Sequence, residues 1–260
     1  MKRTFYHIFC ALFVLLVCAG WAALTVFEIA KTDNIAVPVL LLCLAACCAL
    51  LRLDSLVHES GHLIFGLLAG LRLRRVAFGW VSFGEGGVRF GSRSVAGETQ
   101  FSLKKLQGAH AKLIAATVGG PILGIVFGVI MLALYFVLPM HPALTFFTLY
   151  ALWCLAEGVM ELLPAELVAG KTDGLVLKEL IQRTGETEVA IRIMQAQLLA
   201  KDGDFSHVSR ALLYDVPVVR ADSPAFSELL KLRAAWCEFF GDKAGVSEAQ
   251  TRLQTIAQED

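Results

Sequence analysis

The chain has 260 residues, of which 57% are hydrophobic and 18% are charged, and its 23 basic residues balance its 23 acidic ones. Soluble globular domains are roughly 45–50% apolar and about 25% charged, so this composition excludes an ordinary cytosolic domain. It also excludes a disordered chain, which would be poor in apolar residues. A net charge of zero offers no basic surface of the kind that binds nucleic acid, so we expect no nucleic-acid partner.

The charges are unevenly distributed along the chain. Residues 175–260 hold 10 Lys and Arg and 13 Asp and Glu, which is half of all the charged residues. We therefore predict a sparsely charged transmembrane domain over residues 1–184 and a cytoplasmic helical tail over residues 185–260.

Four apolar segments predict four transmembrane helices, since a helix needs about 20 apolar residues to cross roughly 30 Å of hydrocarbon. They cover residues 8–27, 36–71, 113–138 and 143–163. The first exceeds the roughly 7–15-residue apolar core of a signal peptide, which favours a retained span. The second is long enough for one tilted or kinked helix or for two helical segments. The predicted fold is thus an all-α polytopic membrane protein with a soluble helical tail.

Residues 72–112 are the main polar interruption before the tail. Within them, residues 76–83 and 87–95 flank a glycine-rich turn, which predicts a small β-hairpin-like segment. A connecting loop with some strand character is the alternative. A free strand edge here could pair with an unwound substrate by strand addition.

The basic residues outside the tail predict the orientation of the chain. With four spans, eight of them near the predicted helix ends fall on one side and the opposite loops hold only Lys31, so the positive-inside rule makes the first side cytoplasmic. The eight are Lys2, Arg3, Arg72, Arg74, Arg75, Lys104, Lys105 and Lys112. We therefore expect a multi-pass protein of the cell membrane, with its N terminus and its tail in the cytoplasm.

The sequence of the tail predicts helices separated by turns. Gly203-Asp204 and Gly241-Asp242 each separate two helical segments, and they stand 38 residues apart. This spacing weakly suggests stacked helical hairpins like tetratricopeptide repeats, with a plain helical bundle as the alternative. Such a tail could bind a protein partner.

Residues 58–62 form the sequence His-Glu-Ser-Gly-His. On a helix, His58 and His62 share one face, so both imidazoles can reach one metal ion. Glu59 points to the same place, where it can accept a proton from the attacking water. The alternative is a pair of core histidines, which is less favoured because ionisable residues within a membrane are costly and are usually functional.

A catalytic zinc site needs a third protein ligand and an open position. The candidates near the fourth predicted span are Glu157, Glu161, Glu166 and Asp173. Composition and spacing do not choose among these four residues.

A combination of motifs resembles the site-2 protease family of intramembrane zinc metalloproteases. The motifs are His58-Glu59-Ser60-Gly61-His62, Gly120-Pro121, Leu162-Leu163-Pro164 and Asp173-Gly174. The resemblance covers roughly residues 36–180. It implies that zinc is the cofactor, that Asp173 joins His58 and His62 as a ligand, and that Glu59 is catalytic.

Two positions depart from the family pattern. Glu161 replaces an Asn that helps to hold the substrate strand in the family, and Gly124 stands where an Asn is common. By this likeness, the candidate substrate-binding residues are Glu161, Gly120 and Pro121.

The predicted function is an intramembrane zinc metalloendopeptidase that works in the lipid bilayer. Its substrate would be a transmembrane protein or a signal-peptide-like segment, cut within or near the membrane. One alternative is a zinc peptidase of another class with Glu157 or Glu161 as third ligand. The other is a catalytically silent metal-binding scaffold, which the intact Glu59 disfavours.

Overall fold

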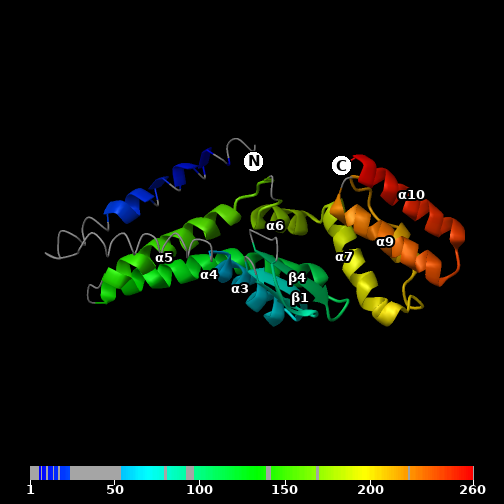
Figure 1. Ribbon diagram of the computed structural model, residues 1–260, viewed down its shortest axis with the longest axis horizontal. Coiled ribbons are helices and arrows are strands. Elements are labelled where there is room, and N and C mark those ends of the chain that lie inside the picture. The colour runs from blue at the N-terminus through cyan, green and yellow to red at the C-terminus, as the bar shows by residue number, and fades with distance from the viewer. Residues whose placement is uncertain are drawn as a thin grey trace. The chain divides into compact units, whose positions relative to one another are not determined.

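The fold is that of a computed structural model (Figure 1). It describes residues 6, 8–9, 11–13, 15–16, 18–23, 54–78, 81–91, 97–138, 142–167, 170–221 and 223–259. The chain divides into two compact units: unit 1 comprises Met1–Phe101 and Leu113–Lys178, and unit 2 comprises Ser102–Lys112 and Glu179–Asp260.

Unit 1 combines helices with one antiparallel sheet. The described residues between 6 and 23 are helical. The helices that follow are α3 (Asp54–Leu68), α4 (Ala109–Val137), α5 (Pro142–Glu161) and α6 (Asp173–Gln182). The strands are β1 (Leu71–Phe78), β2 (Val81–Gly84), β3 (Gly87–Phe90) and β4 (Glu98–Leu103).

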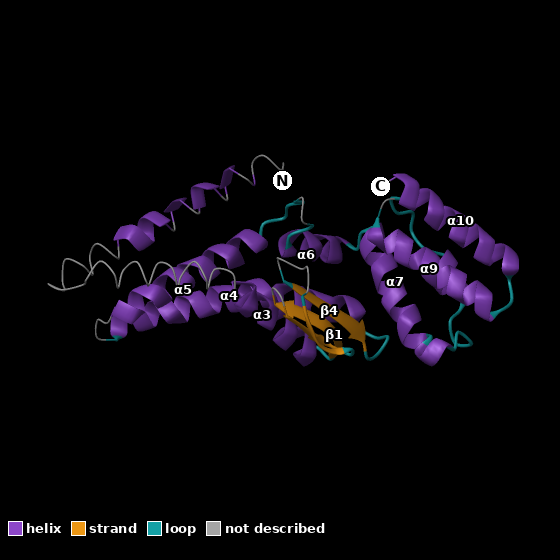
Figure 2. Cartoon of the chain, in the orientation of Figure 1, coloured by secondary structure: helices purple, strands orange, loops and turns teal. Residues whose placement is uncertain are grey.

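The sheet has the order β3-β2-β1-β4, so β3 and β4 form its two edges. Figure 2 shows β1 and β4 side by side. Strands β2 and β3 form a hairpin in which Gly84 pairs with Gly87 across a two-residue turn. The left-handed φ of Gly87, +81°, suits glycine. Helix α3 packs on β1. A Cβ at Gly66 would lie 2.3 Å from the Phe101 ring, so α3 also lies close to β4.

Glycines bring α3, α4 and α5 close together. A Cβ at Gly61 would lie 2.2 Å from the carbonyl oxygen of Gly119, so α3 and α4 meet backbone to backbone there. On α4, a Cβ at Gly128 would lie 2.7 Å from the Ala151 oxygen of α5. Small residues at helix contacts allow such close approach.

The sequence prediction of an all-α polytopic protein with four transmembrane helices is wrong. Unit 1 holds a four-stranded sheet rather than a single hairpin-like segment. Among the described helices, only α4 is long and apolar enough to cross a membrane by length and composition. Helix α3 has 15 residues, about 22 Å at 1.5 Å per residue, which is shorter than a bilayer core of roughly 30 Å. The chain enters β1 at Leu71, so the apolar run does not continue as one helix.

One candidate membrane helix does not support the predicted multi-pass arrangement. Most of the predicted span at residues 36–71 before Asp54, and parts of the span at 8–27, lie outside the described residues. Lys2 and Arg3, on which the predicted side of the N terminus depends, also lie outside them.

Unit 2 is helical. It contains α7 (Gly185–Leu199), the short 3₁₀ helix η2 (Lys201–Gly203), α8 (Arg210–Tyr214), α9 (Pro224–Phe239) and α10 (Lys243–Glu259). Its core includes Val189, Phe205, Leu213 and Leu229. The Trp236 indole packs at this core and donates to the Val208 carbonyl at 2.9 Å. Unit 2 begins its second segment at Glu179, whereas the sequence placed the tail from residue 185, and it also includes residues 102–112.

Candidate metal centre

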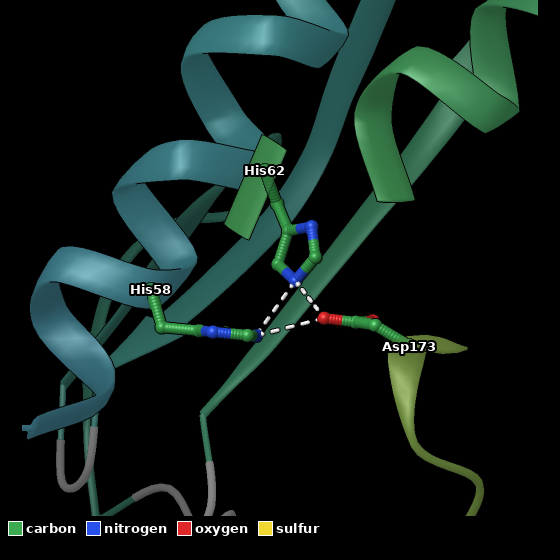
Figure 3. Close-up of side chains that lie close together, drawn as sticks. All are labelled: His58, His62 and Asp173. Atoms are coloured by element: carbon green, nitrogen blue, oxygen red, sulfur yellow. Dashed lines mark hydrogen bonds and ion pairs between the residues drawn. The ribbon is translucent and has the colours of Figure 1, made fainter. Parts of the chain in front are cut away.

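Three side chains converge between α3 and the start of α6 (Figure 3). The Nε2 atoms of His58 and His62 lie 3.0 Å apart. The Asp173 Oδ2 atom lies 3.0 Å from Nε2 of His58 and 3.1 Å from Nε2 of His62. These are the three residues that the family resemblance implied as metal ligands, and the structure brings them together.

The geometry of this triangle fits a zinc ion. Zinc ligands of this kind lie about 2.0–2.2 Å from a tetrahedral metal, which places them about 3.3 Å from one another. Two imidazole nitrogens and one carboxylate oxygen form a donor set typical of catalytic zinc. Asp173 Oδ2 is buried and has no well-directed hydrogen-bond partner among the described residues. An orphaned buried acceptor of this kind suits a cation.

The charge state of Asp173 agrees with a ligand role. Burial by itself would raise the pKa of this carboxyl, but hydrogen bonds from the imidazoles of His58 and His62 hold the pKa below its ordinary value. In turn, Asp173 outweighs the effect of burial on His58 and raises the pKa of that imidazole to about 9. Asp173 is therefore ionised at neutral pH, and a cation bound here would replace the protons that the imidazoles share with it.

The orientation of His62 is fixed by α4. Its Nδ1 lies 2.8 Å from the carbonyl oxygen of Ala116. A carbonyl only accepts, so Nδ1 carries a proton, and in the neutral ring Nε2 keeps the lone pair that a metal needs. The rings of His58 and His62 meet edge to face, with an angle of 81° between their planes. The Nδ1 of His58 is buried and has no partner within the described part of the chain.

Glu59 is held by the beginning of β4. Its side chain is buried, and the hydroxyl of Thr99 donates to its Oε2 atom. Gly97, whose φ is +76°, lies so close that a Cβ there would be 2.7 Å from Glu59 Oε1. The edge strand next to Glu59 is therefore β4. Strand β3 lies at the opposite edge of the sheet.

Asp173 is positioned by a tight backbone turn between α5 and α6. The Thr172 amide donates to the Ala165 carbonyl at 3.0 Å, and the Ala165 amide donates to the Thr172 hydroxyl oxygen at 3.0 Å. The same hydroxyl oxygen accepts from the Leu175 amide at 3.4 Å, so Thr172 caps α6. A Cβ at Gly174 would lie 2.1 Å from the Leu162 oxygen, which explains why glycine follows Asp173.

The predicted substrate-binding residues lie around the ligands. Glu161 Oε2 accepts a hydrogen bond from the Asp173 amide at 3.2 Å, so it holds the start of α6. A Cβ at Gly120 would lie 2.4 Å from His62 Nε2 and 2.9 Å from His58 Nε2. Pro121 is fully buried in α4. These contacts give Glu161 and Gly120 a role in shaping the metal centre.

The other candidate third ligands do not join the triangle. The group of ligand atoms that lie within 4.8 Å of one another consists of His58, His62 and Asp173 in the described part of the chain. It contains neither Glu157 nor Glu161. Glu166 instead forms a backbone bridge with Lys171 in the turn before α6.

Sequence reasoning missed several residues that hold the site. They are Gly61, Gly97, Thr99, Ala116 and Thr172. Thr172 could have been found, because a threonine directly before a helix is a common cap. Thr99 and Ala116 carry no local signal, since they reach the site only through the packing of β4 and α4 on α3.

No protein-family model, curated protein or solved structure matches the chain. The likeness to the site-2 protease family therefore rests on the motif residues alone.

Proposed function

We propose that the protein is a zinc metalloendopeptidase that cleaves membrane-protein substrates within or near a transmembrane segment. The observation that carries this proposal is the three-ligand triangle of His58, His62 and Asp173 with Glu59 on the same helix. The motif likeness to the site-2 protease family supports it.

The metal ligands and Glu59 have separate roles in the proposed reaction. His58, His62 and Asp173 hold zinc, which when bound polarises the scissile carbonyl and makes water a better nucleophile near neutral pH. Glu59 accepts the proton of the attacking water and delivers it to the leaving amine. Thr99 keeps the Glu59 carboxylate in place by its hydrogen bond.

A location at a membrane is supported by the surface of α4. Its second half exposes large apolar side chains, including Val129, Ile130, Phe136 and Val137, at 52–79% of their area. Soluble monomers rarely expose a large apolar patch. The metal centre contacts the first half of the same helix through Ala116 and Gly120, so the reaction takes place close to the bilayer.

The side of the membrane follows from the basic residues before α4. Lys104, Lys105 and Lys112 flank the start of this helix, and no Lys or Arg follows its end before α5. The positive-inside rule places the start of α4 in the cytoplasm. We expect the tail on that side as well, because residues 102–112 belong to the same compact unit as the tail.

The substrate is a transmembrane protein or a signal-peptide-like segment. A helix protects its peptide bonds through its own hydrogen bonds, so the substrate must be extended before it is cut. Strand β4 is an edge strand next to Glu59, and such an edge can add an extended chain by main-chain pairing. Segments with Gly, Pro or Asn unwind most easily.

The test compares Glu59→Gln with Asp173→Ala in purified full-length protein. We expect about one zinc per chain in the wild type and in Glu59→Gln, because the glutamate is not a ligand. Glu59→Gln should cut a transmembrane reporter about 10²–10⁴-fold more slowly, as expected for loss of a general base. Asp173→Ala should lose most of its zinc.

His207→Ala is the matched control, since His207 is exposed in unit 2, and it should keep both zinc and activity. Zinc retained by Asp173→Ala but lost from Glu157→Ala or Glu161→Ala would indicate another class of peptidase. Undiminished cleavage by Glu59→Gln would contradict the proposed catalytic role, and no cleavage by a zinc-loaded wild type would favour a scaffold.

A further inference from the structure

Unit 2 contains a cavity of about 790 Å³ that the metal centre does not use. It lies between residues 106–111, helix α7 and helix α8, and all of its lining residues belong to unit 2. Ligand sites in proteins usually have volumes of roughly 300–1,000 Å³. The cavity is therefore large enough for a small ligand or for the end of a peptide.

Arg183 contributes an uncommitted positive charge to this cavity. It follows α6 in a left-handed conformation, with φ at +52°, and it is the only non-glycine residue with positive φ in the described part of the chain. Glycine or asparagine is usual at such a helix end, so an arginine is strained there. The Arg183 side chain is exposed, and its guanidinium has no ion-pair or hydrogen-bond partner among the described residues. Because Arg183 lines the cavity, its positive charge is available to an anionic ligand there.

Most other charged side chains that line the cavity already have an ion-pair or hydrogen-bond partner. His110 Nε2 lies 2.9 Å from Glu188 Oε1, so this carboxylate is already paired. Arg192 donates to the carbonyl oxygens of Ala211 and Asp215 at the end of α8, which fixes its guanidinium. The Asp215 carboxylate is exposed to solvent. Arg183 is thus the basic side chain of the cavity that is left for a ligand, and a guanidinium fork matches a carboxylate.

The remaining lining suits a peptide better than a compact anion. The Gln195 amide and the Ser209 hydroxyl have no hydrogen-bond partner within the described residues, and either could pair with a peptide main chain. The apolar part of the cavity wall is formed by Leu106, Ile191 and Leu212. A compact inorganic anion would leave this apolar surface without a contact, whereas the last side chain of a peptide would cover it.

We propose that this cavity binds the carboxyl-terminal end of a peptide. The terminal carboxylate pairs with Arg183, the last side chain lies on the apolar wall, and the main chain meets Gln195 and Ser209. The site is distinct from the metal centre, and its assignment does not depend on the proposed peptidase activity.

The test measures binding of acetyl-Gly-Gly-Leu to the full-length protein by calorimetry, in its free-acid and its C-terminal amide forms. The free acid should bind, and the amide should bind about 10–100-fold more weakly because it lacks the charged group. Arg183→Gly should weaken the free acid to a similar extent. Glycine suits the left-handed backbone, so this variant should fold at least as stably as the wild type.

Lys231→Ala is the matched control, because Lys231 is a basic residue of unit 2 outside the cavity, and it should bind like the wild type. Equal binding of acid and amide, or unchanged binding by Arg183→Gly, would overturn the proposal. So would tighter binding of inorganic phosphate than of the free acid, or no binding of the acid at all. Running the assay in the Glu59→Gln background keeps these outcomes independent of cleavage.

Discussion

Gly120 of α4 lies directly against His62 of α3. A Cβ built at Gly120 would lie 2.4 Å from His62 Nε2, the atom that faces the other two ligands. Any side chain at this position would occupy the space of the imidazole. The close packing of α4 on His62 therefore requires a glycine before Pro121.

Gly120→Ala should lower zinc affinity by at least about 10-fold, since changes around metal ligands typically cost 10–100-fold. The physical cause is that the new methyl group displaces both imidazoles. Zinc affinity would be measured by competition with a chelator. Gly20→Ala is the control, because Gly20 is also helical and a Cβ there meets nothing within 4 Å. Equal zinc affinity of Gly120→Ala and wild type would contradict the observed packing.

Thr172→Val should destabilise the start of α6 and weaken zinc binding. Valine keeps the shape of threonine but removes the cap of α6 and leaves the buried Ala165 amide without its acceptor. Loss of a cap costs about 1 kcal/mol, and an unsatisfied buried donor costs about 1–3 kcal/mol. Thermal unfolding and zinc titration would measure the two effects.

Thr172→Ser tests whether the hydroxyl is the cause. It retains the hydroxyl group and should recover most of the zinc affinity that Thr172→Val loses. If serine and valine weaken zinc binding equally, the effect comes from packing of the threonine methyl group, and the hydrogen-bond argument fails.

Thr99→Val should slow cleavage without removing zinc. The Thr99 hydroxyl donates to the Glu59 carboxylate and so stabilises its charged form. Its loss should reduce kcat by about 10-fold or more, as a hydrogen bond to a charged group is worth about 1.5–3 kcal/mol. The acidic limb of the pH–rate profile should move to higher pH, because the carboxylate then protonates more easily.

Comparing the pH–rate profiles of Thr99→Val and Phe90→Pro distinguishes two possible roles of the sheet. One is the positioning of Glu59 by β4, and the other is the pairing of substrate with the β3 edge. Phe90 lies in β3, at the edge opposite β4. The proline should leave both the rate and the profile unchanged. Slower cleavage by Phe90→Pro would show that the substrate uses the β3 edge.

The sequence predicted which side chains lie together at the candidate metal centre better than it predicted the fold around them. The spacing of His58 and His62 places both on one face of a helix, a local rule that holds in any fold. Asp173 needed the family likeness, because three other carboxylates were equally plausible from spacing. Thr99 and Ala116 reach the site only through long-range packing, and no periodic pattern encodes that packing.

The four-helix prediction failed for a related reason. Apolar runs show that segments avoid water, but they do not show where a helix begins or turns into a strand. The run at residues 36–71 contains α3, which starts at Asp54 and ends at Leu68, and the next strand begins at Leu71. The strands after Gly70 were predicted only as a hairpin, because β1 and β4 pair across a long separation in sequence.

Glu188→Ala should loosen residues 102–112 in unit 2. Glu188 lies 2.9 Å from His110, and both side chains are mostly buried, with 30% and 23% of their area exposed. Loss of this pair leaves His110 without its partner and should cost about 1 kcal/mol. Hydrogen exchange should therefore become faster in residues 102–112.

Residues 102–112 connect β4, which contacts Glu59, with α4, which contacts His62. Zinc affinity should then fall as well. Glu248→Ala, which breaks an exposed pair with Arg252, is the control and should change neither measurement. Unchanged exchange in Glu188→Ala would mean that other contacts fix this segment to the tail.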